Sequence, residues 1–249
     1  AYAARVNKDP DTLSYDEAMR DVDREKWLEA ARVEIAALEA MECWDEVPMS
    51  SAKGKIVPGT FVFRRKRTPD GEIKKYKGRF CVRGDLQDKE EDTFAPVVGW
   101  STTRLVLVLS IMWGWVTCTI DFSNAFVHAV LKKPIWIHLP RGFISKYGPK
   151  TCLRLKRSVY GTQIAPCLWY ECCSSALMEL GLKKSAYDPC LFYKHNMMVV
   201  LYVDDAIICA KHERLVDSLV KQLQEKGFTL TREGTFAEYL GIRFDKHAD

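Results

Sequence analysis

Two adjacent acidic residues, Asp204 and Asp205, interrupt a stretch that is otherwise apolar from Val199 to Ala210. The apolar runs on either side have the length and the β-branched composition of neighbouring strands, so the acids are predicted at the bend of a hairpin. Two-residue bends favour Asn-Gly or Asp-Gly because their central residues need a positive φ, which Asp-Asp supplies poorly. The pair is therefore either a solvated turn or a pair held in place for chemistry.

A third acid, Asp121, ends the β-rich run 116–121, and strand ends often display catalytic groups. If the three carboxylates come together, they stay ionised only with cations present, because carboxylates a few Å apart repel each other. Mg²⁺ prefers hard oxygen ligands and is usually held by one or two carboxylates together with substrate phosphates. Two such ions about 4 Å apart activate an attacking hydroxyl and stabilise a leaving phosphate oxygen. Together with a basic, aromatic-bearing segment at residues 61–83, these acids indicate polynucleotide synthesis or cleavage.

A strongly basic hairpin is predicted over residues 61–83, with its turn near Asp70. Its acids are Asp70 and Glu72, and aromatic side chains alternate with the cations. The nine cations are Arg64, Arg65, Lys66, Arg67, Lys74, Lys75, Lys77, Arg79 and Arg83. Such a hairpin suits contact with phosphates and bases, and the alternative is a solvated edge hairpin protected by its charges.

The elements that must position these residues alternate along the chain. Periodicity and capping signals predict helices over 14–41, 101–113, 166–180 and 213–226. Further strands are predicted over 116–121, 134–140, 152–156 and 236–244. Interspersed helices and strands without an internal repeat favour the α+β class, with a central, mainly antiparallel sheet and packed helices.

Composition limits the function less than the motifs do. The 249 residues are 47% hydrophobic, enough for one large or two small cores, and the net charge of +4 is a weak sign of a polyanionic partner. No run approaches the roughly 18 apolar residues of a membrane span. The nine cysteines lack a Cys-x-x-Cys pair, which favours core thiols over disulfides or zinc ligands. The chain lacks an initiator Met, so we expect a piece of a longer polypeptide.

The order of motifs resembles the reverse transcriptase domain of copia-type long-terminal-repeat retrotransposons over nearly the whole chain. Six motifs carry the resemblance: Asp70–Phe80; Thr93–Val98; Asp121–Phe126 followed by Leu139–Phe143; Val159–Gly161 with Ala165, Pro166 and Trp169; Asp188–Phe192; and Tyr202–Asp205. The resemblance implies a right-hand polymerase in which residues 1–249 form one reverse transcriptase domain. Its fingers would be about 50–112 and 134–165, its palm about 113–133 and 166–249, and its N-terminal helix about 14–41.

The resemblance also implies roles for the acids. Asp121 and Asp204 would share two Mg²⁺ ions, for which Mn²⁺ can substitute, and the carbonyl of Phe122 would be an extra ligand. Asp205 would be a secondary, primer-side metal ligand. The reaction implied is RNA- and DNA-templated DNA synthesis, in which a primer 3′-hydroxyl attacks the α-phosphate of a deoxynucleoside triphosphate.

Nucleotide contacts are implied for four further residues. Arg79, assisted by Lys77, would contact the triphosphate, Phe126 would exclude a 2′-hydroxyl, and Tyr160 would pack against the nucleotide and template. Structural alternatives stay open for these positions: Phe126 as ordinary core, Arg79 as a solvated charge, and Tyr160 as packing. The strand containing Tyr239 and Ile242 resembles the one that supports the primer end.

The chain also departs from the family pattern near the nucleotide. The family commonly has Tyr-Gly-Leu-Lys-Gln-Ala-Pro-Arg, whereas residues 160–167 read Tyr-Gly-Thr-Gln-Ile-Ala-Pro-Cys. Gln163, Ile164 and Cys167 thus replace a cation, an amide and an arginine. Thr231-Arg232 stands where the family usually has a Lys-Asp pair, with Arg232 a candidate substitute for that lysine. Lost positive charge would weaken triphosphate binding, so the alternative function is a catalytically decayed, nucleic-acid-binding remnant. A third hypothesis is that the chain is a two-metal nuclease.

The partners implied are an RNA or DNA template with its primer, deoxynucleoside triphosphates, and the flanking integrase and ribonuclease H regions of a polyprotein. No membrane is among them. The resemblance would place such a polyprotein in a cytoplasmic particle or in the nucleus.

Overall fold

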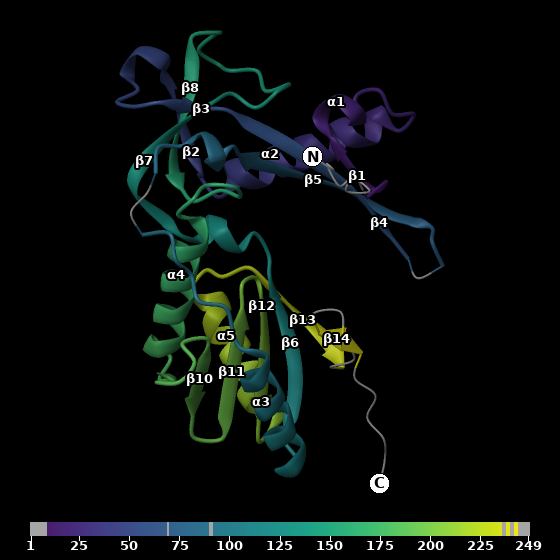
Figure 1. Cartoon of the computed structure of the whole chain (residues 1–249), viewed down its shortest axis with the longest axis vertical. Coiled ribbons are helices and arrows are strands. Elements are labelled where there is room, and N and C mark those ends of the chain that lie inside the picture. Colours follow the sequence, from purple (N-terminus) through teal and green to yellow (C-terminus); the bar gives the residue numbers. More distant parts are fainter. Residues whose placement is uncertain (1–8, 69, 90–91, 236–237, 240–241, 244–249) are drawn as a thin grey trace, which may run out of the picture. The chain divides into compact units, whose positions relative to one another are not determined.

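The structure is a computed structural model that describes residues 9–68, 70–89, 92–235, 238–239 and 242–243 (Figure 1). The chain forms two compact units. Unit 1 comprises Ala1–Glu91 with Val130–Ala165, and unit 2 comprises Asp92–Ala129 with Pro166–Asp249. The architecture is mixed, with helices packed on mainly antiparallel sheets, as the sequence predicts. The division into fingers and palm stays a prediction.

The basic hairpin is the main element of unit 1. Strands β4 (Gly59–Arg67) and β5 (Ile73–Val82) pair antiparallel, and β1 (Thr12–Ser14) adds a third strand along β4 (Figure 1). Helix α2 (Arg24–Ala40) packs on one face of this sheet, with the buried Trp27 ring 5.5 Å from Phe63 and 4.6 Å from Tyr76.

The helix predicted over 14–41 is divided into α1 (Tyr15–Ala18) and α2. The predicted capping contact is present, since the Ser14 backbone N–H donates to Glu17 at 2.8 Å. Between the helices, the Asp21 carboxylate accepts the backbone N–H of Asp23 at 2.8 Å. Such a local side-chain bond competes with helical hydrogen bonding, which accounts for the interruption.

A second sheet of unit 1 has the order β2-β8-β7-β3. Its strands are β2 (Trp44–Pro48), β3 (Ile56–Val57), β7 (Val130–His138) and β8 (Thr151–Arg157). The β3–β7 pair is parallel and the other pairs are antiparallel. The predicted strands 134–140 and 152–156 correspond to β7 and β8.

Unit 2 is built on a six-stranded antiparallel sheet with the order β13-β6-β12-β11-β10-β9. In chain order these are β6 (Val116–Phe122), β9 (Lys183–Lys184), β10 (Leu191–Lys194), β11 (Met197–Tyr202), β12 (Asp205–Ala210) and β13 (Leu230–Thr235). Helices α4 (Ala165–Glu179) and α5 (Glu213–Glu225) cover one face, and α3 (Trp100–Met112) packs on the other (Figure 1).

The end of the chain is described only in part. Strands β14 (Glu238–Tyr239) and β15 (Ile242–Arg243) pair antiparallel, and the other residues of the predicted strand 236–244 lie outside the described residues. In the part of the chain that the structure describes, no helix combines the length and apolar character needed to cross a membrane.

Candidate functional site

Asp121 and Asp205 lie directly opposite each other on the neighbouring strands β6 and β12. Ile120 and Ala206, the adjacent residues, point into the core under α4 and α5. Because side chains alternate along a strand, the two acids project from the opposite face. Both are half-buried, and directly opposed residues have Cβ atoms roughly 5 Å apart. The sheet therefore brings two acidic side chains together at one end of these strands.

The bend of the hairpin lies one residue earlier than predicted. Tyr202 and Asp205 are the closing pair of the β11–β12 ladder, so the two central residues are Val203 and Asp204. The positive φ falls on Val203, at 50°. A left-handed conformation costs a non-glycine residue on the order of 1–2 kcal/mol, and a β-branched side chain makes it rarer still. The prediction that both aspartates form the bend is wrong, since Asp205 already belongs to the ladder.

Neighbouring elements hold this bend by its backbone. The indole N–H of Trp169 on α4 donates to the Val203 carbonyl at 2.5 Å, and the Phe122 N–H donates to the Asp204 carbonyl at 2.7 Å. The Trp169 ring packs edge-on against Phe122 and Phe228, at 5.2 and 5.9 Å. Asp204, which is half-buried, is thereby fixed beside the end of β6.

The donor set suits a hard divalent cation. Among the described residues, no three His, Cys, Asp or Glu side chains form a group that could hold a metal ion by themselves. Mg²⁺, however, is typically held by one or two carboxylates, with water and substrate phosphate completing its shell. The opposed Asp121 and Asp205, with Asp204 next to them, meet that requirement, and like charges facing each other across a ladder favour a bound cation.

Phe126 follows β6 in a single 3₁₀ turn, Ala125–His128. The chain enters this turn through Asn124 at a φ of 53°. The Phe126 side chain is half-buried and packs against the core of unit 2. Its position is thus partly that of a core residue, and its contact with a nucleotide sugar stays a prediction.

The basic hairpin of unit 1 has one face rich in cations and one face that packs aromatic side chains against α2. Cross-strand pairs place Arg64 opposite Lys77 and Lys66 opposite Lys75, and Arg79 lies two residues from Lys77 on the same face. The residues that alternate with them, among them the buried Phe63 and Phe80, point to the face against α2. Like charges in direct opposition destabilise a hairpin, so a bound polyanion would stabilise this face.

Other cations of the hairpin are neutralised by acids that sequence analysis did not associate with them. Arg65 pairs with Asp21 at 2.5 Å and Arg67 with Asp11 at 2.8 Å. The partners are 44 and 56 residues apart in sequence, so no local pattern could have indicated them. The backbone N–H of Asp23 and the Arg65 guanidinium hold the pKa of Asp21 below its ordinary value. Arg65 and Arg67 thus have acidic partners that come from outside the hairpin.

Arg79 is stacked on an aromatic ring. Its guanidinium carbon lies 4.1 Å from the centroid of the Tyr160 ring, and the Val82 N–H donates to the Tyr160 carbonyl at 2.7 Å. Beneath the same strand, Glu34 of α2 accepts the Phe80 N–H at 3.1 Å. Burial raises the pKa of Glu34, against the smaller opposing effects of that N–H and of the nearby cations Arg79 and Lys77. No motif or spacing in the sequence distinguishes Glu34 from the other acids of this helix.

The predicted site residues thus fall into two groups. Unit 1 contains Arg79, Lys77 and Tyr160, and unit 2 contains the three aspartates and Phe126. Arg232, considered as a substitute for a family lysine, forms ion pairs with Glu213 and with Asp217 of α5, the latter at 2.7 Å.

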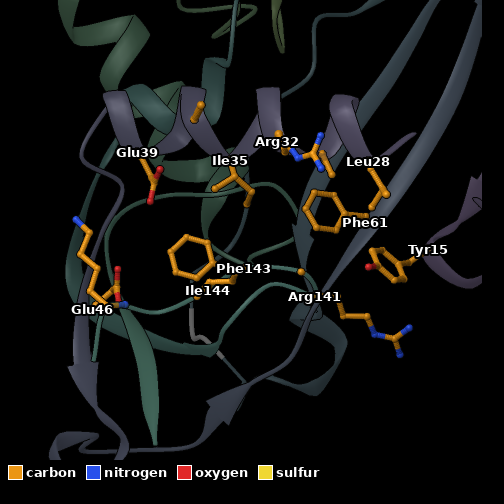
Figure 2. A pocket seen from close by; sticks show the side chains of 14 residues that line it. Tyr15, Leu28, Arg32, Ile35, Glu39, Glu46, Phe61, Arg141, Phe143 and Ile144 are labelled. Atoms are coloured by element: carbon orange, nitrogen blue, oxygen red, sulfur yellow. The ribbon is translucent and has the colours of Figure 1, made fainter. Parts of the chain in front are cut away.

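Two pockets adjoin these elements. An apolar pocket of about 300 Å³ in unit 2 is lined by Val203 and Trp169 together with residues 93–97. A pocket of about 410 Å³ in unit 1 lies between α2, Phe61 and residues 141–146, with Ile35 and Phe143 pointing into it (Figure 2). None of the predicted site residues lines this second pocket.

Comparisons with known proteins agree on one family. The model of the family described as reverse transcriptase (RNA-dependent DNA polymerase) matches residues 41–249. The retrovirus-related Pol polyprotein from transposon RE1 of Arabidopsis thaliana is 29% identical over 233 residues, covering 91% of this chain and 16% of that protein. The polyprotein from transposon RE2 of the same plant is 28% identical over 249 residues, covering 97% and 17%. The Ty1-ER2 Gag-Pol polyprotein of Saccharomyces cerevisiae is 29% identical over 248 residues, covering 92% and 13%.

Proposed function

Because the chain belongs to the reverse transcriptase (RNA-dependent DNA polymerase) family, of the copia type, we propose that it extends a primer on an RNA or DNA template by a two-metal mechanism. The observation that carries this proposal is the register of β6 and β12, which sets Asp121 opposite Asp205 beside the bend that contains Asp204. The chain spans roughly one sixth of the length of the relatives compared above, so the proposal concerns this domain.

The three aspartates would hold the ions, of which Asp121 and Asp204 would share both and Asp205 would have a secondary role. When bound, two Mg²⁺ ions would increase the acidity of the primer 3′-hydroxyl and stabilise the leaving pyrophosphate oxygen. The chain's own contribution is positional, since the backbone bonds from Trp169 and Phe122 fix the bend before substrate arrives. Phe126 would exclude a 2′-hydroxyl by occupying the space beside the sugar.

The basic residues would bind the polyanionic substrates. A guanidinium stacked on an aromatic ring keeps its N–H groups in one plane, the geometry that bidentate phosphate contacts require. Arg79 would use it to bind the triphosphate, with Lys77 as a second cation on the same face. Arg64, Lys66 and Lys75, which extend this face along the hairpin, would contact the template backbone.

A primer-extension assay on an RNA template tests the proposal. Asp121→Asn and Asp204→Asn should each lower Mg²⁺-dependent extension by on the order of 100-fold or more, as expected when electrostatic support of a transition state is removed. Asp217→Asn, which alters an exposed acid of α5, should retain activity. Absence of Mg²⁺-dependent extension by the wild-type chain, or equal extension by Asp204→Asn, would contradict the proposal.

A second candidate is a nucleic-acid-binding module without catalysis. The neutral Gln163 and Ile164 and the cationic hairpin face favour it. It predicts binding to primer-template that weakens with salt and survives substitution of the aspartates. Removing one phosphate-contacting cation, as in Lys66→Gln, should reduce the salt slope by about 1. Normal turnover by the wild-type chain would reject this candidate.

The relatives are Pol and Gag-Pol polyproteins, which supports a longer polypeptide around this domain. We propose that integrase and ribonuclease H regions flank it there. Expression of the longer transcript, followed by mass spectrometry of its products, would test this arrangement.

A further inference from the structure

We propose that Gln163 is a positioning residue for nucleotide binding, which fixes the Tyr160 ring and, through it, the guanidinium of Arg79. The inference rests on the proposed function, because it assigns Arg79 to the triphosphate. It concerns one of the positions at which the chain departs from the family pattern, where lysine is usual. All the contacts that carry it lie within unit 1.

Gln163 is bound to the turn that follows β5 through both its side chain and its backbone. Its side-chain amide donates to the Gly84 carbonyl at 2.6 Å, and its backbone N–H donates to the side-chain oxygen of Gln87 at 3.0 Å. Gly84 begins a single 3₁₀ turn, Gly84–Leu86, directly after the strand that carries Arg79. Gln163 thus joins the loop containing Tyr160 to the end of the basic hairpin.

The two segments approach so closely that only glycine fits at the contact. A Cβ on Gly84 would lie 2.0 Å from the Gly161 carbonyl oxygen, and one on Gly161 would lie 2.2 Å from the Val82 carbonyl oxygen. Gly161 also has a φ of +85°, which other residues rarely adopt. Together with the bond from the Val82 N–H to the Tyr160 carbonyl, this contact sets the backbone on both sides of the ring.

The position of the Tyr160 ring determines where the guanidinium of Arg79 lies. Tyr160 is buried, with 8% of its surface exposed, so its ring orientation follows that of the fixed backbone. Arg79 stacks on this ring at 4.1 Å. In the part of the chain that the structure describes, its guanidinium makes no hydrogen bond or ion pair, although Glu34 attracts it at longer range. The ring therefore presents Arg79 with its N–H groups available to a phosphate.

Glutamine at residue 163 can take the place of the family's lysine in the contact with Gly84. What the Gly84 carbonyl requires is a donor, and both an amide and an ammonium group can donate. A side chain of similar length without a donor would leave that carbonyl unpaired and loosen the Tyr160 loop. Gln163 thus keeps the hydrogen bond that ties the Tyr160 loop to Gly84.

Gln163→Met and Gln163→Lys in the full chain separate the donor from side-chain volume. In steady-state extension, Gln163→Met should raise the deoxynucleotide KM about three- to tenfold, the scale of one lost hydrogen bond, with kcat within twofold. Gln163→Lys should restore KM to within twofold of wild type. Gln222→Met, which removes an amide bonded to Ser218 on α5, should change neither constant. An unchanged KM in Gln163→Met, or equal defects in Met and Lys variants, would overturn the inference.

A binding measurement separates failure of this inference from failure of the proposed function. If the wild-type chain extends no primer, the polymerase proposal fails, and calorimetry with inorganic tripolyphosphate then decides the role of Gln163. The same three- to tenfold loss of affinity is expected in Gln163→Met, with recovery in Gln163→Lys and loss of binding in Arg79→Met. Equal affinity in wild type and Gln163→Met, or no binding by the wild-type chain, would overturn it.

Discussion

At the scale of single residues, Val203 links the bend geometry to stability. Its φ of 50° costs on the order of 1–2 kcal/mol for a non-glycine residue, whereas glycine adopts it without that cost. Val203→Gly should therefore leave the free energy of unfolding unchanged or raise it by up to about 1 kcal/mol, since the side chain that is lost is exposed. Chemical denaturation of the purified chain would measure this.

Val62→Gly is the matched control for that substitution. Val62 is exposed to a similar extent, 40% against 37% for Val203, and lies inside β4 with ordinary strand geometry. Glycine there should lower the free energy of unfolding by about 1 kcal/mol. Inside a strand, the conformational freedom of glycine brings no advantage and costs entropy on folding. Equal losses in both variants would show that the bend at Val203 stores no strain.

The same bend shows how far individual residues could be predicted. The apolar, β-branched runs on either side of the acids correctly indicated the hairpin, and the register of the sheet places the acid at the end of β6 opposite Asp205. The position of the bend was wrong by one residue because local propensity favours two aspartates over Val-Asp in a turn. Hydrogen bonds from Trp169 and Phe122 hold the observed bend, and both come from elements distant in sequence.

At the scale of elements, Glu34 couples α2 to the basic hairpin. Burial raises its pKa above the ordinary 4.5, so its contribution to stability is full below pH 4.5 and is lost as the pH rises through the folded-state pKa. Glu34→Gln keeps an acceptor for the Phe80 N–H and removes the charge. It should raise Tm at pH 7 by about 2–4 °C, the shift that about 1 kcal/mol produces in a chain of this size.

The effect of Glu34→Gln should disappear at pH 4, where the wild-type carboxyl is protonated. Glu39→Gln, on the exposed side of the same helix, should give no such difference between the two pH values. A Tm that rises equally at pH 7 and pH 4 would assign the gain to packing. A fall at pH 7 would mean that attraction to Arg79 and Lys77 outweighs burial.

Elements were predicted well where one face is apolar and poorly where local bonds compete. Helix α5 matches its predicted range 213–226 closely, because buried Val216, Leu219 and Leu223 share one face. The range of α3 was also predicted, but not its buried face, since exposed Leu105 and Val108 are as apolar as buried Val106. The break between α1 and α2 depends on Asp21, whose second partner, Arg65, lies in another element.

At the scale of the whole molecule, the chain passes between its two units at 91/92, 129/130 and 165/166. Neither unit is continuous in sequence, which hydrophobic periodicity alone does not indicate. The resemblance predicted a discontinuous division into fingers and palm, and that assignment stays a prediction. The nine cysteines are free thiols, so no disulfide joins the segments of either unit.

The units should differ in acid sensitivity. In the described part of the chain, hydrogen bonds hold the pKa of six unit 1 aspartates below the ordinary 3.8: Asp9, Asp11, Asp21, Asp23, Asp45 and Asp85. The largest causes are hydrogen bonds, such as those that Arg67 donates to Asp11 and Arg154 to Asp45. A lowered pKa stabilises the fold above pH 3.8, and that contribution is lost as the pH falls through the folded-state pKa.

Brief pepsin digestion at pH 4, 3 and 2, with the peptides identified by mass spectrometry, would reveal which unit opens first. Cleavage within residues 9–68 and 130–165 is expected at a higher pH than cleavage within 166–235, because protonation releases the acids that bind β1, α1 and α2 to the hairpin. Asp11→Asn should move the first cleavages of unit 1 to a higher pH, whereas Asp217→Asn should not. If unit 2 is cut first, its core, and not this network of acids, limits the acid stability of the chain.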